Sequence, residues 1–156
     1  MKLNYIVIPL IVFLVALAGS LITSGGMDWY KTIRLPDWTP SGAVIGAAWT
    51  IIFILAAISV LVFWNKFPRG KKFNWIFLIF FINALLNILW SYLFFGQHLI
   101  GWAVWGAGLL GLSVILLIAL IRPVSHLASV LLFPYAIWVI FATYLTYTVW
   151  NLNILK

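Results

Sequence analysis

The chain has 156 residues, of which 66% are hydrophobic and 7% are charged, with a formal net charge of +7 and no cysteine. Charged residues are too few to give a soluble domain a polar surface. The composition therefore places the chain among integral membrane proteins. The lack of cysteine excludes disulfides and sulfur-ligated metals. Asp28 and Asp37 are the only acidic residues, which argues against paired-carboxylate catalysis, and no metal site is expected.

Five apolar runs are long enough to cross a bilayer, which takes about 20 residues each. They predict an all-α integral membrane protein, with one domain over residues 1–156 that forms a single bundle of five transmembrane helices. The expected spans are 5–22, 42–64, 73–95, 99–121 and 127–150, and the long loop is 23–41.

The first run also has features of a secretory signal. Lys2 precedes it, and Ala16-Leu17-Ala18-Gly19 is typical of a cleavage site. Because the apolar run continues through Leu21 and Ile22, we interpret it as a retained span.

Basic residues are distributed unequally between the two sides of the membrane. Six Lys and Arg, among them Lys2 and Arg122, lie on the side of the N-terminus, against Lys31, Arg34 and Lys156 on the other. The positive-inside rule predicts a multi-pass protein of the cell membrane with a cytoplasmic N-terminus, an external C-terminus and an external first loop. Because the basic residues lie in short segments between spans, they indicate a lipid bilayer as partner and no nucleic acid.

The first loop has features of a folded lid. Two prolines and a glycine pair fix turns, and its aromatic side chains favour packing against the helix ends. Its spacing allows Asp28 to pair with Lys31, and Arg34 with Asp37. The alternative is that Lys31 or Arg34 contacts an anionic group of a ligand.

Three tryptophans lie inside the predicted spans and share a helical face with aromatic, amide or apolar residues, by the three-to-four-residue recurrence of an α-helix. All lie in the outer half of the bundle, so they predict an aromatic cavity that opens toward the first loop. The three groups are Trp49 with Phe53, Trp90 with Asn83 and Asn87, and Trp138 with Phe141, Ala142 and Leu145.

Two further patterns have alternative interpretations. Asn83 and Asn87 should point into the bundle, either to hydrogen-bond between helices or to orient a ligand. In the fourth span, Ala103, Ala107 and Gly111 allow close helix approach, either within the chain or at a homodimer seam. The histidines, His98 and His126, lie at span boundaries, and no pattern places either beside the cavity as a haem ligand.

Several motifs in order resemble the translocator protein family, whose bacterial members are called tryptophan-rich sensory proteins, or TspO. The resemblance implies a five-helix bundle, often a homodimer, whose pocket under the first loop binds porphyrins and synthetic isoquinoline-carboxamide or benzodiazepine-type ligands. The motifs are Trp29-Tyr30, Leu35-Pro36-Asp37-Trp38-Thr39-Pro40, Gly46-Ala47-Ala48-Trp49, Asn87-Ile88-Leu89-Trp90, Phe94-Phe95-Gly96, Pro134-Tyr135, Trp138 and Phe141-Ala142-Thr143.

The resemblance and the spacing together give one set of expected ligand contacts. No intrinsic cofactor is expected, and protoporphyrin IX or haem is the expected ligand. The family's sterol motif needs a basic residue where this chain has Asn151, which argues against cholesterol binding. The expected ligand-binding residues are Tyr30, Trp49, Phe53, Asn83, Asn87, Trp90, Phe94, Trp138, Phe141, Ala142 and Leu145.

Three functions are consistent with these features. The first is a porphyrin-binding protein with a sensory or regulatory role in tetrapyrrole metabolism or stress. The second is an enzyme that degrades protoporphyrin IX with light and oxygen, in which Trp49 and Trp138 would be the catalytic residues. The third is a porphyrin or lipid transporter, which is disfavoured because no ionisable residue lies within a span to couple ions.

Overall fold

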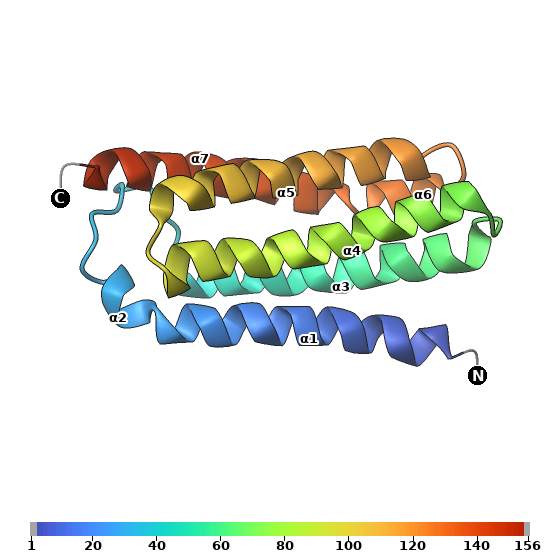
Figure 1. Ribbon diagram of the computed structural model, residues 1–156, viewed down its shortest axis with the longest axis horizontal. Helices are drawn as coiled ribbons and strands as arrows, with labels where there is room; N and C mark the ends of the chain where they lie inside the picture. The colour runs from blue at the N-terminus through green and yellow to red at the C-terminus, as the bar shows by residue number, and fades with distance from the viewer. Residues whose placement is uncertain (1–2, 155–156) are drawn as a thin grey trace.

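Five long helices lie side by side in one bundle in the computed structural model, which describes residues 3–154 (Figure 1). All five are long and apolar enough to cross a membrane, which confirms the predicted all-α membrane fold. The helical elements are α1 (Asn4–Gly25), α2 (Met27–Tyr30), α3 (Gly42–Lys66), α4 (Lys71–Ser91), the π-helix η1 (Tyr92–Gly96), α5 (Ile100–Ile121), α6 (His126–Val130) and α7 (Phe133–Asn153).

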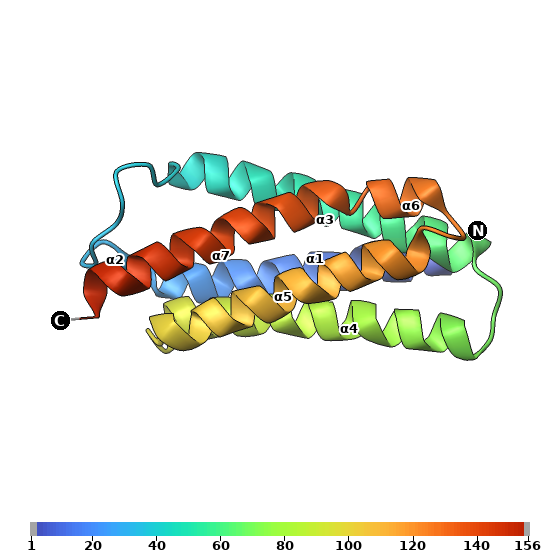
Figure 2. The ribbon, with the colours of Figure 1, turned by 90° about the horizontal axis from the view of Figure 1, so that it is seen from above.

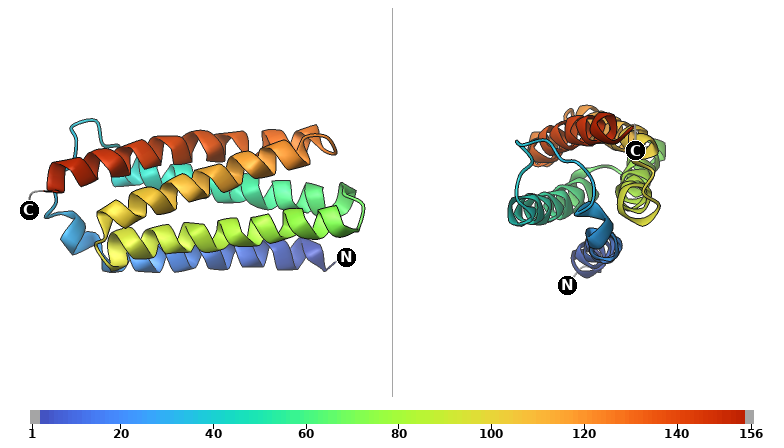
Figure 3. Two further views of the ribbon diagram at one scale, coloured as in Figure 1. Left: turned by 45° about the horizontal axis from the view of Figure 1, so that its top comes forward. Right: turned by 90° about the vertical axis from the view of Figure 1, so that its left-hand side faces the viewer.

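The first loop and α2 cover one end of this bundle. α1 begins at the opposite end, and α7 ends at the same end of the bundle as α2 (Figure 1). The segment after α2 runs across this end before α3 begins (Figure 3). We call residues 27–41 the lid, and the end that they cover the lid end.

Two of the predicted spans are less regular than expected. The third ends in η1, where the backbone N–H of Gln97 donates to the carbonyl of Tyr92 at 2.8 Å, the wider spacing of a π-helix. The fifth is not one helix over 127–150, because α6 ends at Val130 and α7 starts at Phe133. Pro134 lies in the first turn of α7, where a residue without a backbone N–H is tolerated, so the chain restarts a helix there.

α5 is the most buried helix and packs between α4 and α7 (Figure 2). Ala103, Ala107 and Gly111 are buried inside the chain. A Cβ added to Gly111 would lie 3.3 Å from Cγ1 of Val139 on α7, so this small-residue face serves helix packing within the chain, one of the two alternatives expected.

The dense core lies away from the lid. It contains the ring stack of Phe63 and Phe73, whose centroids are 4.9 Å apart, and continues through α5 and α7. The guanidinium of Arg69 lies 4.0 Å from the Phe73 ring centroid and covers the core from outside. α1 contributes one buried residue, Ile8, so most of this helix lies outside the dense core.

Candidate functional site

A cavity of about 530 Å³ lies beneath the lid, between α1, α3, the end of α4 with η1, and α7. Eight of its lining side chains are aromatic, and none is charged. Its size is within the range of small-molecule sites, which is about 300–1,000 Å³. We call it the main cavity.

The structure brings ten of the eleven expected ligand-binding residues together in the lining of the main cavity. They come from four separate parts of the chain, which supports the helical faces expected from the spacing. The ten are Tyr30, Trp49, Phe53, Asn87, Trp90, Phe94, Trp138, Phe141, Ala142 and Leu145.

The aromatic side chains contact one another both within a helix and between helices. The ring centroids of Trp49 and Trp90 are 6.4 Å apart, and Trp49 is stacked on Phe53 at 5.7 Å. On η1, Phe94 is stacked on Trp90 at 5.7 Å. Trp138 contacts Phe141 on the same helix, at 5.3 Å. The walls therefore offer several ring faces and edges to a flat ligand.

Two of the indole rings that line the main cavity have a buried N–H group without a hydrogen-bond partner among the described residues. Nε1 of Trp90 and Nε1 of Trp138 are buried, and neither has a hydrogen-bond acceptor among the described residues. An unpaired buried donor costs about 1–3 kcal/mol. A ligand with acceptor atoms would relieve this cost if the indoles turned toward it.

Asn83 lies outside the main cavity, unlike the other expected residues. Its Nδ2 donates to Oγ of Ser113 at 2.9 Å, and its Oδ1 accepts from the Tyr135 hydroxyl at 3.2 Å. The same hydroxyl accepts from Nδ2 of Asn87 at 3.2 Å. Asn83 therefore forms hydrogen bonds between helices, which is one of the two alternatives expected for it. Asn87 extends this network to the wall of the main cavity.

Sequence reasoning missed the wall that α1 provides. Small and hydroxyl residues recur along one face of this helix at spacings of three and four, which is the helical period. That recurrence was the available signal, but it lies within an otherwise apolar span. The residues are Ala16, Gly19, Ser20, Thr23 and Ser24.

The lid is attached to the bundle through aromatic stacking at η1 and the following turn. Trp29 is stacked on His98 with centroids 4.2 Å apart, and Tyr30 contacts Phe94 at 6.1 Å and Phe95 at 5.6 Å. Half-burial of Tyr30 raises its pKa above the ordinary value, because burial disfavours the phenolate.

The lid is also fixed to the end of α7. The side chain of Asn153 accepts from the backbone N–H of Arg34 at 3.0 Å and donates to the carbonyl of Arg34 at 2.9 Å. Farther along, Trp38 is stacked on Tyr144 at 5.5 Å. The lid is therefore held from both α7 and η1.

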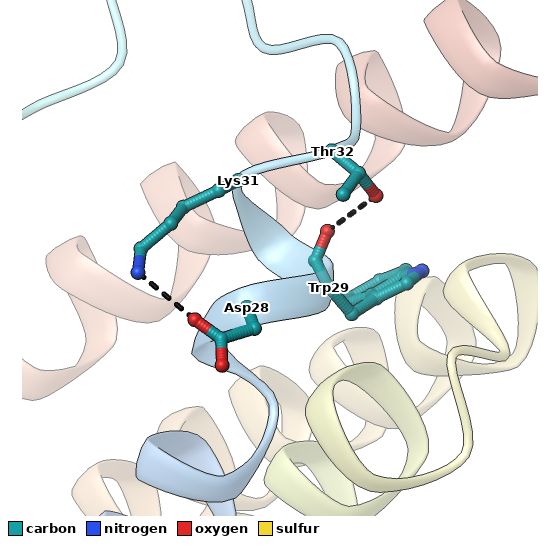
Figure 4. Close-up of polar contacts among 4 residues, drawn as sticks. All are labelled: Asp28, Trp29, Lys31 and Thr32. Carbon is teal, nitrogen blue, oxygen red and sulfur yellow. Dashed lines mark hydrogen bonds and ion pairs between the residues drawn. The ribbon is translucent and has the colours of Figure 1, made fainter.

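No charged residue of the lid lines the main cavity. Lys31 pairs with Asp28 at 3.0 Å on the surface, as the spacing predicted (Figure 4). The second predicted pair, between Arg34 and Asp37, is not among the ion pairs of the described residues. Neither Lys31 nor Arg34 lines the cavity, although both lie in the segment that covers it.

The chain is similar to known membrane proteins over most of its length. The model of the TspO/MBR family matches residues 6–151. The chain is 31% identical over 153 residues to the tryptophan-rich protein TspO of Bacillus cereus, which covers 98% of this chain and 99% of that protein. It is 37% identical over 128 residues to the membrane protein YtaB of Bacillus subtilis, 81% of each chain. It is 30% identical over 137 residues to the human translocator protein, 86% of this chain and 81% of that one.

Proposed function

This chain belongs to the TspO/MBR family, and from that membership we propose that it binds porphyrins, with protoporphyrin IX as the reference ligand, in the main cavity. Haem and drug-like isoquinoline-carboxamide or benzodiazepine-type molecules are further ligands of the same site. Ligand binding would alter the lid and so give a sensory or regulatory role in tetrapyrrole metabolism or stress. The observation that carries the proposal is the lining of eight aromatic side chains in a cavity of about 530 Å³.

The chemistry of the walls suits a large flat ring. Stacked or edge-on aromatic pairs contribute about 0.5–1.5 kcal/mol each beyond the area they bury, and the tryptophans present such surfaces to the cavity. The unpaired indole N–H groups of Trp90 and Trp138 would donate to acceptor atoms at the edge of a porphyrin, which are its carboxylate oxygens.

The position of the lid suggests an orientation for the ligand. Apolar and aromatic residues line the cavity, whereas the nearby cations Lys31 and Arg34 lie in the lid. Because burying an unpaired carboxylate is costly, we propose that the two propionates of the porphyrin lie at the lid end.

A binding titration with matched variants tests this function. Protoporphyrin IX is added in the dark to the protein in lipid nanodiscs, and quenching of tryptophan fluorescence is followed. Ala142→Phe puts a ring into the main cavity, and we expect it to weaken binding at least tenfold. Ala47→Phe makes the same change on an exposed face of α3 outside the cavity and should leave binding unchanged. Equal affinities of the two variants would show that the porphyrin binds elsewhere.

A light-driven enzyme is a second candidate, favoured by the uncharged lining. The lining has no Asp, Glu, His, Lys or Arg, so the bound porphyrin would itself absorb the light and be oxidised by molecular oxygen. Trp49 and Trp138, which both line the cavity, would be the catalytic residues. Illumination in air should then give a protein-dependent product spectrum, absent from a Trp138→Phe variant that still binds. An identical spectrum without protein would exclude this activity.

A further inference from the structure

A second, smaller cavity of about 120 Å³ lies next to the main cavity, and Phe53 and Asn87 line both. We call it the annex. On α1, its wall runs from Ile8 to Val15, and that of the main cavity continues from Ala16 to Ser24. At a rise of 1.5 Å per residue, the two walls together extend about 24 Å along this helix. The two cavities therefore follow one another along α1, with Phe53 and Asn87 between them.

The polar groups beside the annex are bonded to one another. Asn87 donates to the Tyr135 hydroxyl, which donates to Asn83, and Asn83 donates to Ser113. The Ser113 hydroxyl donates in turn to the carbonyl of Leu110 at 2.7 Å. The side chains of Asn83, Tyr135 and Ser113 therefore have hydrogen-bond partners within the protein, whereas the side-chain oxygen of Asn87, which lines both cavities, has none among the described residues.

The rest of the annex lining is apolar, from α1, α3 and α4. An apolar cavity of about 150 Å³ stays dry and binds benzene, so the annex has room for about six carbon atoms. An occupant of this site is therefore expected to be hydrocarbon and without a polar end.

We propose that the annex is a subsite for the hydrocarbon tail of a ligand whose ring system lies in the main cavity. This inference rests on the proposed function of the main cavity. With the propionates at the lid end, the opposite edge of the porphyrin faces Phe53 and Asn87. An alkyl substituent on that edge enters the annex when the Phe53 ring, which is stacked on Trp49 at 5.7 Å, turns aside.

The bilayer is the other source of a hydrocarbon chain. Ile11, Phe77 and Phe81 line the annex and are also exposed at the outer surface of the bundle, so a lipid chain has access from the side. A tail gains no hydrophobic energy by leaving lipid for the annex. Its gain comes from filling a void with dispersion contacts, so the expected preference is moderate.

Two porphyrins that differ only in the length of one chain test the subsite. Mesoporphyrin IX carries ethyl groups on the edge opposite its propionates, and its analogue has one of these ethyl groups replaced by hexyl. Both are titrated into the protein in nanodiscs, and partition into empty nanodiscs is subtracted. We expect the hexyl compound to bind at least fivefold more tightly to the wild type.

Variants that fill the annex provide the control. Ala84→Leu puts a larger side chain into the annex, and we expect the hexyl preference to disappear while mesoporphyrin IX binds within twofold of wild type. Ala56→Leu fills the annex from α3 and replaces the first variant if that one does not fold. Ala47→Leu makes the same change outside both cavities and should keep the preference.

Each other result has a definite meaning. No hexyl preference in the wild type would show that bilayer lipid fills the annex or that the tail avoids it, and would overturn the subsite. An undiminished preference in Ala84→Leu would place the tail elsewhere and also overturn it. In both cases, saturable binding of mesoporphyrin IX leaves the proposed porphyrin site standing. If neither porphyrin bound saturably, the function of the main cavity would itself be wrong.

Discussion

Gly26 makes the closest approach between the start of the lid and the bundle. A Cβ built on this residue would lie 2.4 Å from the backbone oxygen of Phe95 on η1, a distance that real Cβ atoms do not reach. Gly26→Ala must therefore push α2 away from η1. We expect a loss of about 1–3 kcal/mol of stability, typical of overpacking, and weaker protoporphyrin IX binding, measured by thermal unfolding and fluorescence titration.

The neighbouring glycine is the matched control. A Cβ on Gly25 would meet no atom within 4 Å, and Gly25 is the last residue of α1. Alanine at this position should leave the porphyrin affinity unchanged, and should leave the unfolding temperature unchanged or raise it slightly. Equal losses for the two variants would mean that the contact with Phe95 does not position the lid.

Residue spacing predicted most of the residues that line the main cavity, but it could not show that Asn87 lines this cavity and Asn83 does not. Both lie on one face of α4, as a spacing of four predicts, but they are about 6 Å apart along the helix. Only the position of the neighbouring helices decides that Asn87 reaches the main cavity while Asn83 lies beside the annex. The α1 wall was missed for a related reason, because hydroxyl groups in a span do not reveal which neighbour they face.

At the scale of elements, the lid depends on a few contacts at its two sides. Asn153 makes both of its lid hydrogen bonds to the backbone of Arg34, and each such bond contributes about 0.5–1.5 kcal/mol. Asn153→Ala should therefore open the lid more often and speed porphyrin dissociation about fivefold or more. Stopped-flow dissociation measures the rate, and hydrogen exchange of residues 31–41 reports the opening.

Asn151→Ala is the control for this experiment. Asn151 is an exposed residue of the same helix, and it has no hydrogen bond to the lid among the described residues. Its dissociation rate should match the wild type. A rate increase shared by both variants would indicate general loosening of α7 and contradict a specific role of Asn153.

We expect Tyr30 to make lid closure dependent on pH. Its pKa is raised above 10.0 by burial in the closed lid, so the closed state holds the phenolic proton more tightly than the open state. The contribution of Tyr30 to closure is therefore fully present below about pH 10 and is lost as the pH rises through its raised pKa. We expect porphyrin dissociation from the wild type to accelerate above about pH 10, measured by stopped flow between pH 8.5 and 11. A Tyr30→Phe variant with the same acceleration would assign it to another group.

The two irregular elements show what hydrophobic periodicity does not determine. Apolar runs identified all five long spans, because each crosses the same hydrocarbon thickness. The π-helix after α4 and the break before α7 lie within apolar runs, so the hydrophobicity of the sequence does not reveal them. Pro134 was a local signal for the break, since proline is common in the first turn of a helix. In η1, no residue of the sequence indicates a π-helix. Phe94 of this element lines the main cavity, and Phe95 contacts Tyr30 of the lid.

At the scale of the whole molecule, the two halves of the bundle differ in packing. A core of phenylalanines and aliphatic residues fills the space between α3, α4, α5 and α7, whereas the cavities lie beside α1, the main cavity near the lid and the annex farther from it. Because the lid packs on a separate cluster around Phe94 and Val149, a movement of the lid on ligand binding need not disturb the larger core. The homodimer implied by the family resemblance stays a prediction, and the buried face of α5 is not available to form it.

The charge distribution predicts which side of the membrane the lid occupies. Lys66, Arg69, Lys71, Lys72 and Arg122 lie at the end opposite the lid, against Lys31 and Arg34 in the lid, while Lys2 and Lys156 fall outside the described residues. The positive-inside rule then puts the lid outside the cell.

The absence of native cysteine makes this orientation simple to measure. Asp37→Cys places a single thiol in the lid and Pro68→Cys places one at the opposite end, both at exposed positions. A membrane-impermeant maleimide should label Asp37→Cys in intact cells, and Pro68→Cys only after permeabilisation. The reverse pattern would put the lid in the cytoplasm. A porphyrin entering beneath the lid would then come from inside the cell, so the protein would respond to cytoplasmic rather than external tetrapyrrole.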